Sequence, residues 1–188
     1  LTVRLPYSKR DFGVPANLHI IGTMNTADRS IAQLDIALRR RFIFRELEPN
    51  SAKLPKMVGN IPLRRVLEVI NDRIEYLIDR EHRIGHAFFL GDGGRDRTAI
   101  DATMQGKVIP LLQEYFFEDW SRVAAVLGER PGNGGAFLKC RKLTDPTGGG
   151  GEDRESWSVL KSFAADAYDR LIGKVPTADD AAAEEAPE

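Results

Sequence analysis

The amino-acid sequence predicts an α/β core followed by a mainly α-helical domain. Residues 18–24 are mostly apolar and bounded by turn residues, which is typical of a strand buried on both faces of a parallel sheet. Residues 63–78 instead repeat apolar side chains at every third or fourth position, which is the pattern of an amphipathic helix. Between them, residues 49–62 contain three prolines and a glycine, which indicates a boundary.

The predicted core contains three strands and one helix. Residues 1–6, 18–24 and 42–47 are the predicted strands, and Ser30 is a suitable cap for a helix that begins near Ile31. The sequence starts with Leu1, inside a predicted strand. We therefore expect the chain to be a fragment of a longer protein.

The remainder of the chain is predicted to be mostly helical. After the amphipathic helix, helices are expected over residues 98–117 and 118–127, and a short strand over 136–143. A last amphipathic helix is expected to end near Ile172, with Trp157, Leu160, Phe163, Ala167 and Leu171 as its apolar face. Residues 148–151 are all glycine, which predicts a flexible linker, and residues 174–188 have the composition of a disordered tail.

The composition excludes several classes of protein. The 188 residues carry a formal net charge of −1, so the surface as a whole has no basic footprint for nucleic acid. The single cysteine, Cys140, excludes an internal disulfide framework and a four-cysteine zinc site. The sequence has neither a signal peptide nor an apolar stretch of the roughly 18 residues that a membrane helix needs. We expect a cytoplasmic protein.

A first candidate site follows the strand predicted at 18–24, where Asn25, Asp28 and Arg29 occur close together. Ligands of open α/β sheets gather at the carboxyl ends of the strands. A neutral amide such as Asn25 could hold a water molecule in line with a terminal phosphate. Two alternatives remain: Asn25 simply turns the chain while Asp28 and Arg29 pair locally, or the four residues from Asn25 to Asp28 form a guanine-reading N-x-x-D element, although Thr26 replaces its usual lysine.

A second candidate is the run of three arginines, Arg39, Arg40 and Arg41, between the predicted helix and the strand at 42–47. Cations at the carboxyl end of a helix are favoured by its dipole, and exposed arginines are usually only solvated. Planar guanidinium groups also suit phosphate recognition across a subunit interface.

The third candidate comprises Arg83 and His86, which lie on either side of Ile84 and Gly85. Either side chain could face a nucleotide, or both could be structural. His19 lies on a predicted buried strand, where a structural role is expected. With three histidines and no ligand spacing to nearby acids, the sequence predicts no metal site.

Two absences limit what the chain can do. The sequence contains no G-x-x-x-x-G-K-[ST] loop, whose backbone N–H groups would cradle phosphates. No apolar strand ends in an Asp-Glu pair that could hold magnesium. Tight binding of a triphosphate by this chain alone is therefore not expected.

The order of these clusters along the chain indicates a protein family more specifically than any single cluster does. Residues 20–32 read IIGTMNTADRSIA, and LD, ALRRRF and EP follow at 34–35, 37–42 and 48–49. Further along come RIGH, FF and PLLQEYFFED, at 83–86, 88–89 and 110–119. This arrangement resembles the McrB-type AAA+ GTPases of methylation-dependent restriction systems, over roughly residues 1–128.

The resemblance implies a partial AAA+ core, the second half of a parallel P-loop-NTPase sheet at 1–49, followed by an α-helical lid at 61–128 and an extension at 129–173. By the same resemblance, Asn25 is the sensor-1 residue beside the γ-phosphate. Asp28 and Arg29 organise the hydrolytic water and couple it to the partner subunit. Arg40 and Arg41 are arginine fingers, with Arg39 in reserve, and Arg83 and His86 belong to the lid.

The resemblance also implies GTP or ATP with Mg²⁺ as cofactor, a homo-oligomeric ring, by resemblance a hexamer, and a McrC-type nuclease partner. DNA would be contacted through other domains or through that partner. The phosphate-binding loop is missing from this sequence, so the fragment is expected to be inactive alone. Two alternatives remain: an ATPase of the MoxR-like or dynein-related AAA+ group, and a catalytically dead assembly or adaptor module.

Overall fold

The computed structural model describes residues 2–25, 27, 40–117, 119–130, 135–144 and 154–173. It divides into two compact units, Leu1–Ile43 and Phe44–Glu188. Each unit is described by itself.

The described regular structure of the first unit is a small antiparallel hairpin. Strand β1 (Thr2–Arg4) pairs with β2 (Asp11–Gly13), and Val3 lies opposite Phe12. The Leu5 N–H donates to the Arg10 carbonyl over 2.9 Å, and the Arg4 Nε donates to the Lys9 carbonyl over 3.0 Å. These two hydrogen bonds close the turn.

The parallel sheet predicted from residues 1–6, 18–24 and 42–47 is not confirmed. Residues 18–24 and 42–47 form no strand, and β1 has an antiparallel partner. Ile20 and Ile21 are 67% and 93% exposed, whereas a parallel strand needs hydrogen-bonded neighbours and helices over both faces. The described residues of this unit supply neither. Most of the helix predicted from Ile31 lies outside the described residues.

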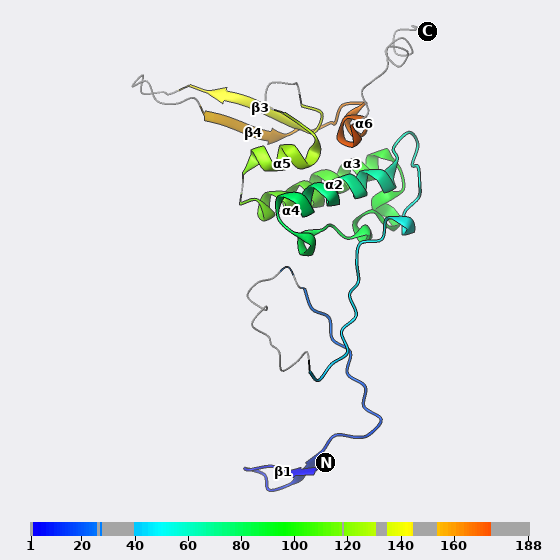
Figure 1. The fold of residues 1–188 in the computed structure, drawn as a ribbon, viewed down its shortest axis with the longest axis vertical. Helices are drawn as coiled ribbons and strands as arrows, with labels where there is room; N and C mark the ends of the chain where they lie inside the picture. The colour runs from blue at the N-terminus through cyan, green and yellow to red at the C-terminus, as the bar shows by residue number, and fades with distance from the viewer. Residues whose placement is uncertain are drawn as a thin grey trace. The chain divides into compact units, whose positions relative to one another are not determined.

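The second unit is built around α2 (Leu63–Leu77), which confirms the amphipathic helix predicted at 63–78. Its apolar side chains at three- and four-residue spacing are buried, and each such side chain contributes about 1.5–3 kcal/mol when fully removed from water. The buried residues of α2 are Leu63, Val66, Leu67, Val69, Ile70, Asn71 and Ile74. Figure 1 shows α2 within a helical body that also contains α3, α4 and α5.

A nearly continuous helical rod covers most of the predicted helix at 98–117. It consists of α3 (Arg97–Thr103), a π-helical turn η5 (Met104–Val108) and α4 (Ile109–Tyr115). Pro110 near the start of α4 has no N–H and cannot make the ordinary bond to the carbonyl four residues earlier. The wider π turn directly precedes it, and Met104, Val108 and Ile109 are fully buried there.

Helix α5 (Trp120–Leu127) confirms the helix predicted at 118–127. The Asp119 side chain caps it by accepting from the Ser121 and Arg122 N–H groups, at 3.1 and 3.4 Å. Gly128 ends the helix with a left-handed backbone, at φ 78°. The Arg73 guanidinium of α2 donates to the Val126 carbonyl over 2.8 Å and so joins the two helices.

Short elements connect these helices. The 3-10 turns are η1 (Ser51–Lys53), η2 (Arg80–His82), η3 (His86–Phe89) and η4 (Gly91–Gly94). Val58 and Ile61 form an isolated antiparallel bridge just before α2.

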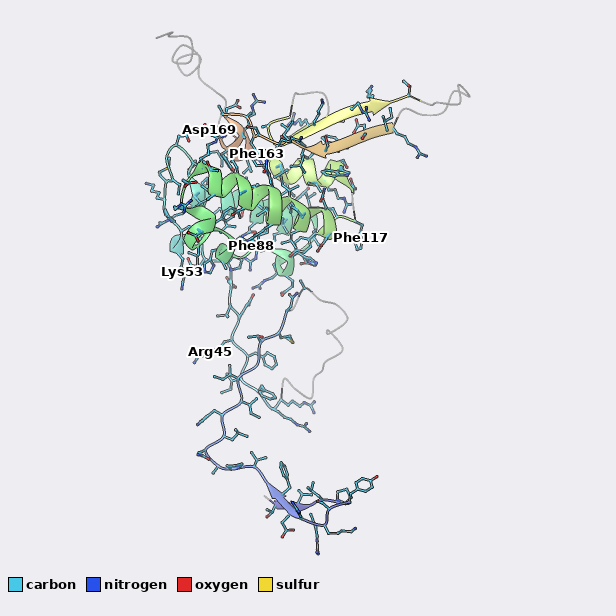
Figure 2. The ribbon with its side chains drawn as sticks, turned by 180° about the vertical axis from the view of Figure 1, so that it is seen from behind. Arg45, Lys53, Phe88, Phe117, Phe163 and Asp169 are labelled. Atoms are coloured by element: carbon cyan, nitrogen blue, oxygen red, sulfur yellow. The ribbon has the colours of Figure 1, made fainter. Side chains whose placement is uncertain are left out.

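Strand β3 (Leu138–Leu143) confirms the strand predicted at 136–143 and pairs antiparallel with β4 (Arg154–Val159). The base of this hairpin is fixed by Glu129, whose carboxylate accepts the N–H groups of Ala136, Phe137 and Leu138. Phe163, labelled in Figure 2, meets the ring of Phe137 edge-on, with ring centroids 4.8 Å apart. The extension thus shares one core with the helices.

The predicted last helix is largely wrong, because residues 154–159 form β4 and only α6 (Ala167–Ile172) is helical. The apolar spacing at Trp157, Leu160 and Phe163 fits a helix, but β3 needs a strand partner, and residues 154–159 supply it. The predicted linker at 148–151 and the predicted disordered tail at 174–188 lie outside the described residues.

Tyr168 on α6 connects the extension to α3. Its hydroxyl donates to the Asp101 carboxylate over 2.5 Å, and burial, together with that carboxylate, raises the pKa of Tyr168 above its ordinary value. Arg97 also donates to the carbonyls of Ala164 and Ala165, at 2.7 and 2.8 Å. These bonds hold α6 against the helical rod.

Candidate functional site

Of the first predicted cluster, Asn25 is described and Asp28 and Arg29 lie outside the described residues. Asn25 is exposed, and its Oδ1 accepts the Ala27 N–H over 3.2 Å. That bond turns the chain directly after residues 18–24. The side-chain carbonyl of Asn25 thus accepts a hydrogen bond from a residue two positions away. The side-chain NH₂ group of Asn25 has no hydrogen bond to a described residue in this unit.

The described members of the arginine cluster, Arg40 and Arg41, are both exposed. Neither forms an ion pair with an acidic side chain among the described residues. Arg39 lies outside the described part of the chain. Two permanently charged, exposed guanidinium groups beside each other are available to an anion from another molecule.

Arg83 and His86 lie in the second unit, in a segment that a buried amide holds in place. Asn71 of α2 is 8% exposed. Its Nδ2 donates to the Ile84 carbonyl over 3.0 Å, and its Oδ1 accepts the Ile84 N–H over 2.6 Å. Both backbone groups of Ile84 are thereby satisfied. The positions of Arg83 and Gly85, on either side of Ile84, are fixed by these two bonds.

The Arg83 side chain is only 20% exposed and is directed back onto its own unit. Its Nε donates to the Arg80 carbonyl over 3.0 Å, and its terminal nitrogen lies 3.7 Å from the Glu75 carboxylate. Three of its five N–H donors take no part in these bonds. A guanidinium held in this way is pre-positioned rather than free to rotate.

His86 accepts a hydrogen bond from a distant part of the chain. The Asn50 N–H donates to its Nδ1 over 3.1 Å. Because a backbone N–H can only donate, this bond requires the tautomer with the proton on Nε2. The predicted lid histidine therefore fastens the segment that enters the helical unit.

Arg80 joins the same two segments by charge. One of its terminal nitrogens lies 2.6 Å from the Glu46 carboxylate and 2.9 Å from the Glu48 carboxylate. Glu46, the nearer, is the main cause that raises the pKa of Arg80 above its ordinary value. Residues 46–51 and 79–86, which we call the junction, are thus connected by both ion pairs and hydrogen bonds.

Asp79, the first residue of the second junction segment, stabilises the turn that follows it. The Asp79 carboxylate caps η2 by accepting the Glu81 and His82 N–H groups, and it lies 2.7 Å from His82 Nδ1. Desolvation alone would raise the pKa of Asp79, but the hydrogen bonds and the charge of His82 outweigh it and lower the pKa. The His82 ring packs edge-on against Tyr115 of α4, at 4.9 Å.

The sequence pattern pointed to Arg83 and His86 but not to Asn71, Asp79 or Arg80, which position them. These three residues belong to a helix face or a turn, where polar residues usually meet solvent. The capping position of Asp79 before a charged turn was the one available signal.

Two further findings concern metal binding and membrane spans. Within the described ranges, no group of three or more His, Cys, Asp or Glu residues is placed to hold a metal ion. None of the helices described combines the length and the apolar character needed to cross a bilayer.

Comparison with known proteins assigns the helical unit. The family described as the α-helical lid domain of McrB matches residues 62–124, the region that contains α2 to α4, the first part of α5, and Arg83 and His86. The chain is also similar to the type IV methyl-directed restriction enzyme EcoKMcrB subunit of Escherichia coli (strain K12), with 38% identity over 140 residues.

That similarity covers 63% of this chain and 30% of the E. coli subunit, so the chain spans less than a third of its relative. The family match and this similarity both point to McrB. Together they show that the chain is a McrB-type protein, with a McrB α-helical lid domain at residues 62–124.

Proposed function

We propose that this chain supplies the lid and the arginine fingers of a McrB-like AAA+ nucleoside-triphosphatase. The complete protein hydrolyses GTP or ATP in a homo-oligomeric ring, by resemblance a hexamer, and drives a McrC-type nuclease in DNA restriction and phage defence. The observation that carries the proposal is the McrB lid at residues 62–124. The similarity to a methyl-directed restriction enzyme subunit supports its biological setting.

In this proposal the exposed Arg40 and Arg41 act on the neighbouring subunit. Rings are built from head-to-tail contacts that close by rotation, so one subunit's surface reaches the nucleotide of the next. An arginine supplied in trans stabilises the charge that develops on the transferred phosphoryl group and is worth roughly 10³ to 10⁵ in rate. The exposure of both side chains supports this role.

Asn25, Asp28 and Arg29 are proposed to act on the nucleotide of their own subunit, where Asn25 positions the attacking water. Arg83 and His86 are proposed to couple the lid to that nucleotide. Arg83 contacts it with its remaining donors, while His86 holds the junction through the Asn50 N–H. Hydrolysis then depends mainly on positioning and on charge stabilisation.

Mg²⁺ is implied by this chemistry, but the described residues do not suit it. They include no group of three His, Cys, Asp or Glu placed to hold a metal. We therefore assign no residue of this chain to the metal.

The test uses the complete subunit. Arg40→Ala and Arg41→Ala should each lower turnover by at least about tenfold while nucleotide binding is largely retained, because the fingers act in the transition state. Phosphate release measures turnover, and a fluorescent nucleotide measures binding. Arg45→Ala, which removes another exposed arginine a few positions further along the sequence, is the matched control and should leave both unchanged.

Full activity in both finger variants would contradict the assignment. Competition between GTP and ATP for the complete subunit decides the remaining alternatives. A preference for ATP favours the MoxR-like or dynein-related group, and failure to bind either nucleotide favours an assembly or adaptor module.

A further inference from the structure

The hairpin β3–β4 has two chemically different faces. Residues directly opposite each other in an antiparallel pair share a face, and successive residues alternate between faces. One face, the inner face, carries Leu138, Cys140, Lys142, Glu155, Trp157 and Val159. The other, the outer face, carries Lys139, Arg141, Leu143, Arg154, Ser156 and Ser158.

The inner face packs onto the helical core and holds the acidic residue of the hairpin. Leu138 is fully buried, and Trp157 and Val159 pack against the core cluster. The Glu155 carboxylate accepts the indole N–H of Trp157 over 3.1 Å and lies opposite Lys142. Charge on this face is therefore balanced.

The outer face is basic and open to solvent. Lys139, Arg141 and Arg154 are exposed, and none of the described strand residues that share their face is acidic. No ion pair links any of the three to an acidic side chain in the part of the chain that the structure describes. The outer face thus gathers three positive charges within a chain whose net charge is −1.

These charges form a row. Lys139 and Arg141 are two residues apart on one strand, a distance of about 7 Å. Arg154 is the diagonal neighbour of Arg141 across the ladder, again about 7–8 Å away. Like charges this close repel one another, and an anionic partner would relieve that repulsion.

We propose that the outer face of the β3–β4 hairpin binds the phosphate backbone of double-stranded DNA. Phosphates recur about every 3.4 Å along the axis of one DNA strand, so cations about 7 Å apart meet different phosphates. Serine hydroxyls also contact phosphate oxygens, and Ser156 and Ser158 lie opposite Arg141 and Lys139.

The composition of the outer face favours duplex over single-stranded nucleic acid. Single strands are bound largely by stacking of their bases on aromatic side chains. The outer face carries no aromatic residue, since Trp157 lies on the inner face. Backbone contacts without base contacts make the binding independent of sequence.

The hairpin is held firmly enough to present this face. The Glu129 carboxylate accepts three consecutive N–H groups at the start of β3. The Leu160 N–H donates to the Phe137 carbonyl over 2.9 Å and fixes the end of β4. The outer face therefore keeps its orientation on the helical unit without DNA.

The test measures binding of the full chain to a labelled duplex of arbitrary sequence, about 20 base pairs long, by fluorescence anisotropy without nucleotide. With three phosphate contacts, log affinity should fall with log salt with a slope of about −2.7 between about 50 and 200 mM. Lys139→Gln, Arg141→Gln and Arg154→Gln should each weaken binding several-fold and reduce the slope by about one. Because no nucleotide is present, failure here is separate from failure of the proposed hydrolysis.

Lys142→Gln is the matched control, because it removes one positive charge from the same strand as Lys139 and Arg141 but from the inner face. It should leave affinity and slope close to those of the unaltered chain, and far-ultraviolet circular dichroism checks that each variant is folded. Three results would overturn the proposal: no duplex binding at low salt, equal losses in Lys142→Gln and Lys139→Gln, or competition by polyglutamate or a single strand as effective as by unlabelled duplex at equal charge.

Discussion

Asn71 determines the local structure around the predicted lid residues more than either of those residues does. Its amide makes two hydrogen bonds to Ile84, at 2.6 and 3.0 Å, and both partners are buried. An apolar side chain at this position would leave the Ile84 N–H and carbonyl without partners. A buried group that loses its partner costs about 1–3 kcal/mol.

Asn71→Ala should therefore lower the free energy of unfolding by about 2–4 kcal/mol. Urea denaturation followed by circular dichroism measures this change. Asp72→Ala, at an exposed position next along the same helix, should stay within about 0.5 kcal/mol of the unaltered chain. Equal effects of the two substitutions would show that the Asn71 bonds contribute little.

At this scale the sequence pointed to Arg83 and His86 as candidates and missed the residues that position them. Arg83 and His86 were recognisable from a short pattern of residue types. Asn71 was not, because it lies between Ile70 and Ile74 on a helix, and only the path of the chain after α2 brings Ile84 to it. A sequence does not reveal which backbone group returns to a given side chain.

At the scale of elements, the base of the β3–β4 hairpin depends on a glycine as much as on Glu129. A Cβ at Gly135 would lie 1.4 Å from the Leu138 carbonyl oxygen. No real contact is so short, and the obstacle is backbone, so the turn must open if any side chain is added.

Gly135→Ala should destabilise the chain by at least about 2 kcal/mol, since the start of β3 must shift away from Glu129. Gly106→Ala is the same substitution in the helical rod, where a Cβ would meet nothing within 4 Å. It should be neutral or stabilising by up to about 1 kcal/mol, because alanine favours helix. Thermal melts of both variants decide the matter, and a stable Gly135→Ala variant would contradict the expected clash.

The helices before residue 128 could be predicted from the sequence, whereas the last predicted helix was largely wrong. The difference lies in the length of the apolar pattern. Residues 63–78 repeat their apolar positions over four turns, which no strand can imitate. The apolar residues Trp157, Leu160 and Phe163 also have helical spacing, but they divide between a strand and a loop. A pattern of so few positions does not distinguish a helix from a strand. Residues 154–159 form a strand because β3 needs a hydrogen-bonded partner.

At the scale of the whole molecule, this chain by itself should hydrolyse neither GTP nor ATP. Its sequence contains no loop of the G-x-x-x-x-G-K-[ST] type, and without that cradle of N–H groups a triphosphate is not held for attack. Phosphate release from the purified chain, measured beside the complete subunit, should equal the buffer blank. Turnover by the chain alone would disprove this prediction.

The α/β core was the part of the fold that the sequence predicted least well. Residues 18–24 have the composition of a buried strand, yet Ile21 is 93% exposed and no strand forms there. The apolar composition of a segment indicates that it is suited to burial. Whether it is buried depends on neighbouring strands and helices, which the described residues of the first unit do not provide. Its predicted site residues, Asn25, Arg40 and Arg41, therefore remain proposals.

The junction has a consequence for how the lid is attached. Arg80, Glu46 and Glu48 are about half exposed, with side chains at 48%, 58% and 55%. Solvent and salt screen such charges, whereas the apolar interior of the helical unit is indifferent to ionic strength. Glu46 and Glu48 can therefore exchange Arg80 for water at little cost in free energy while the helical unit stays folded. The attachment of residues 46–48 to this unit should weaken as the salt concentration rises.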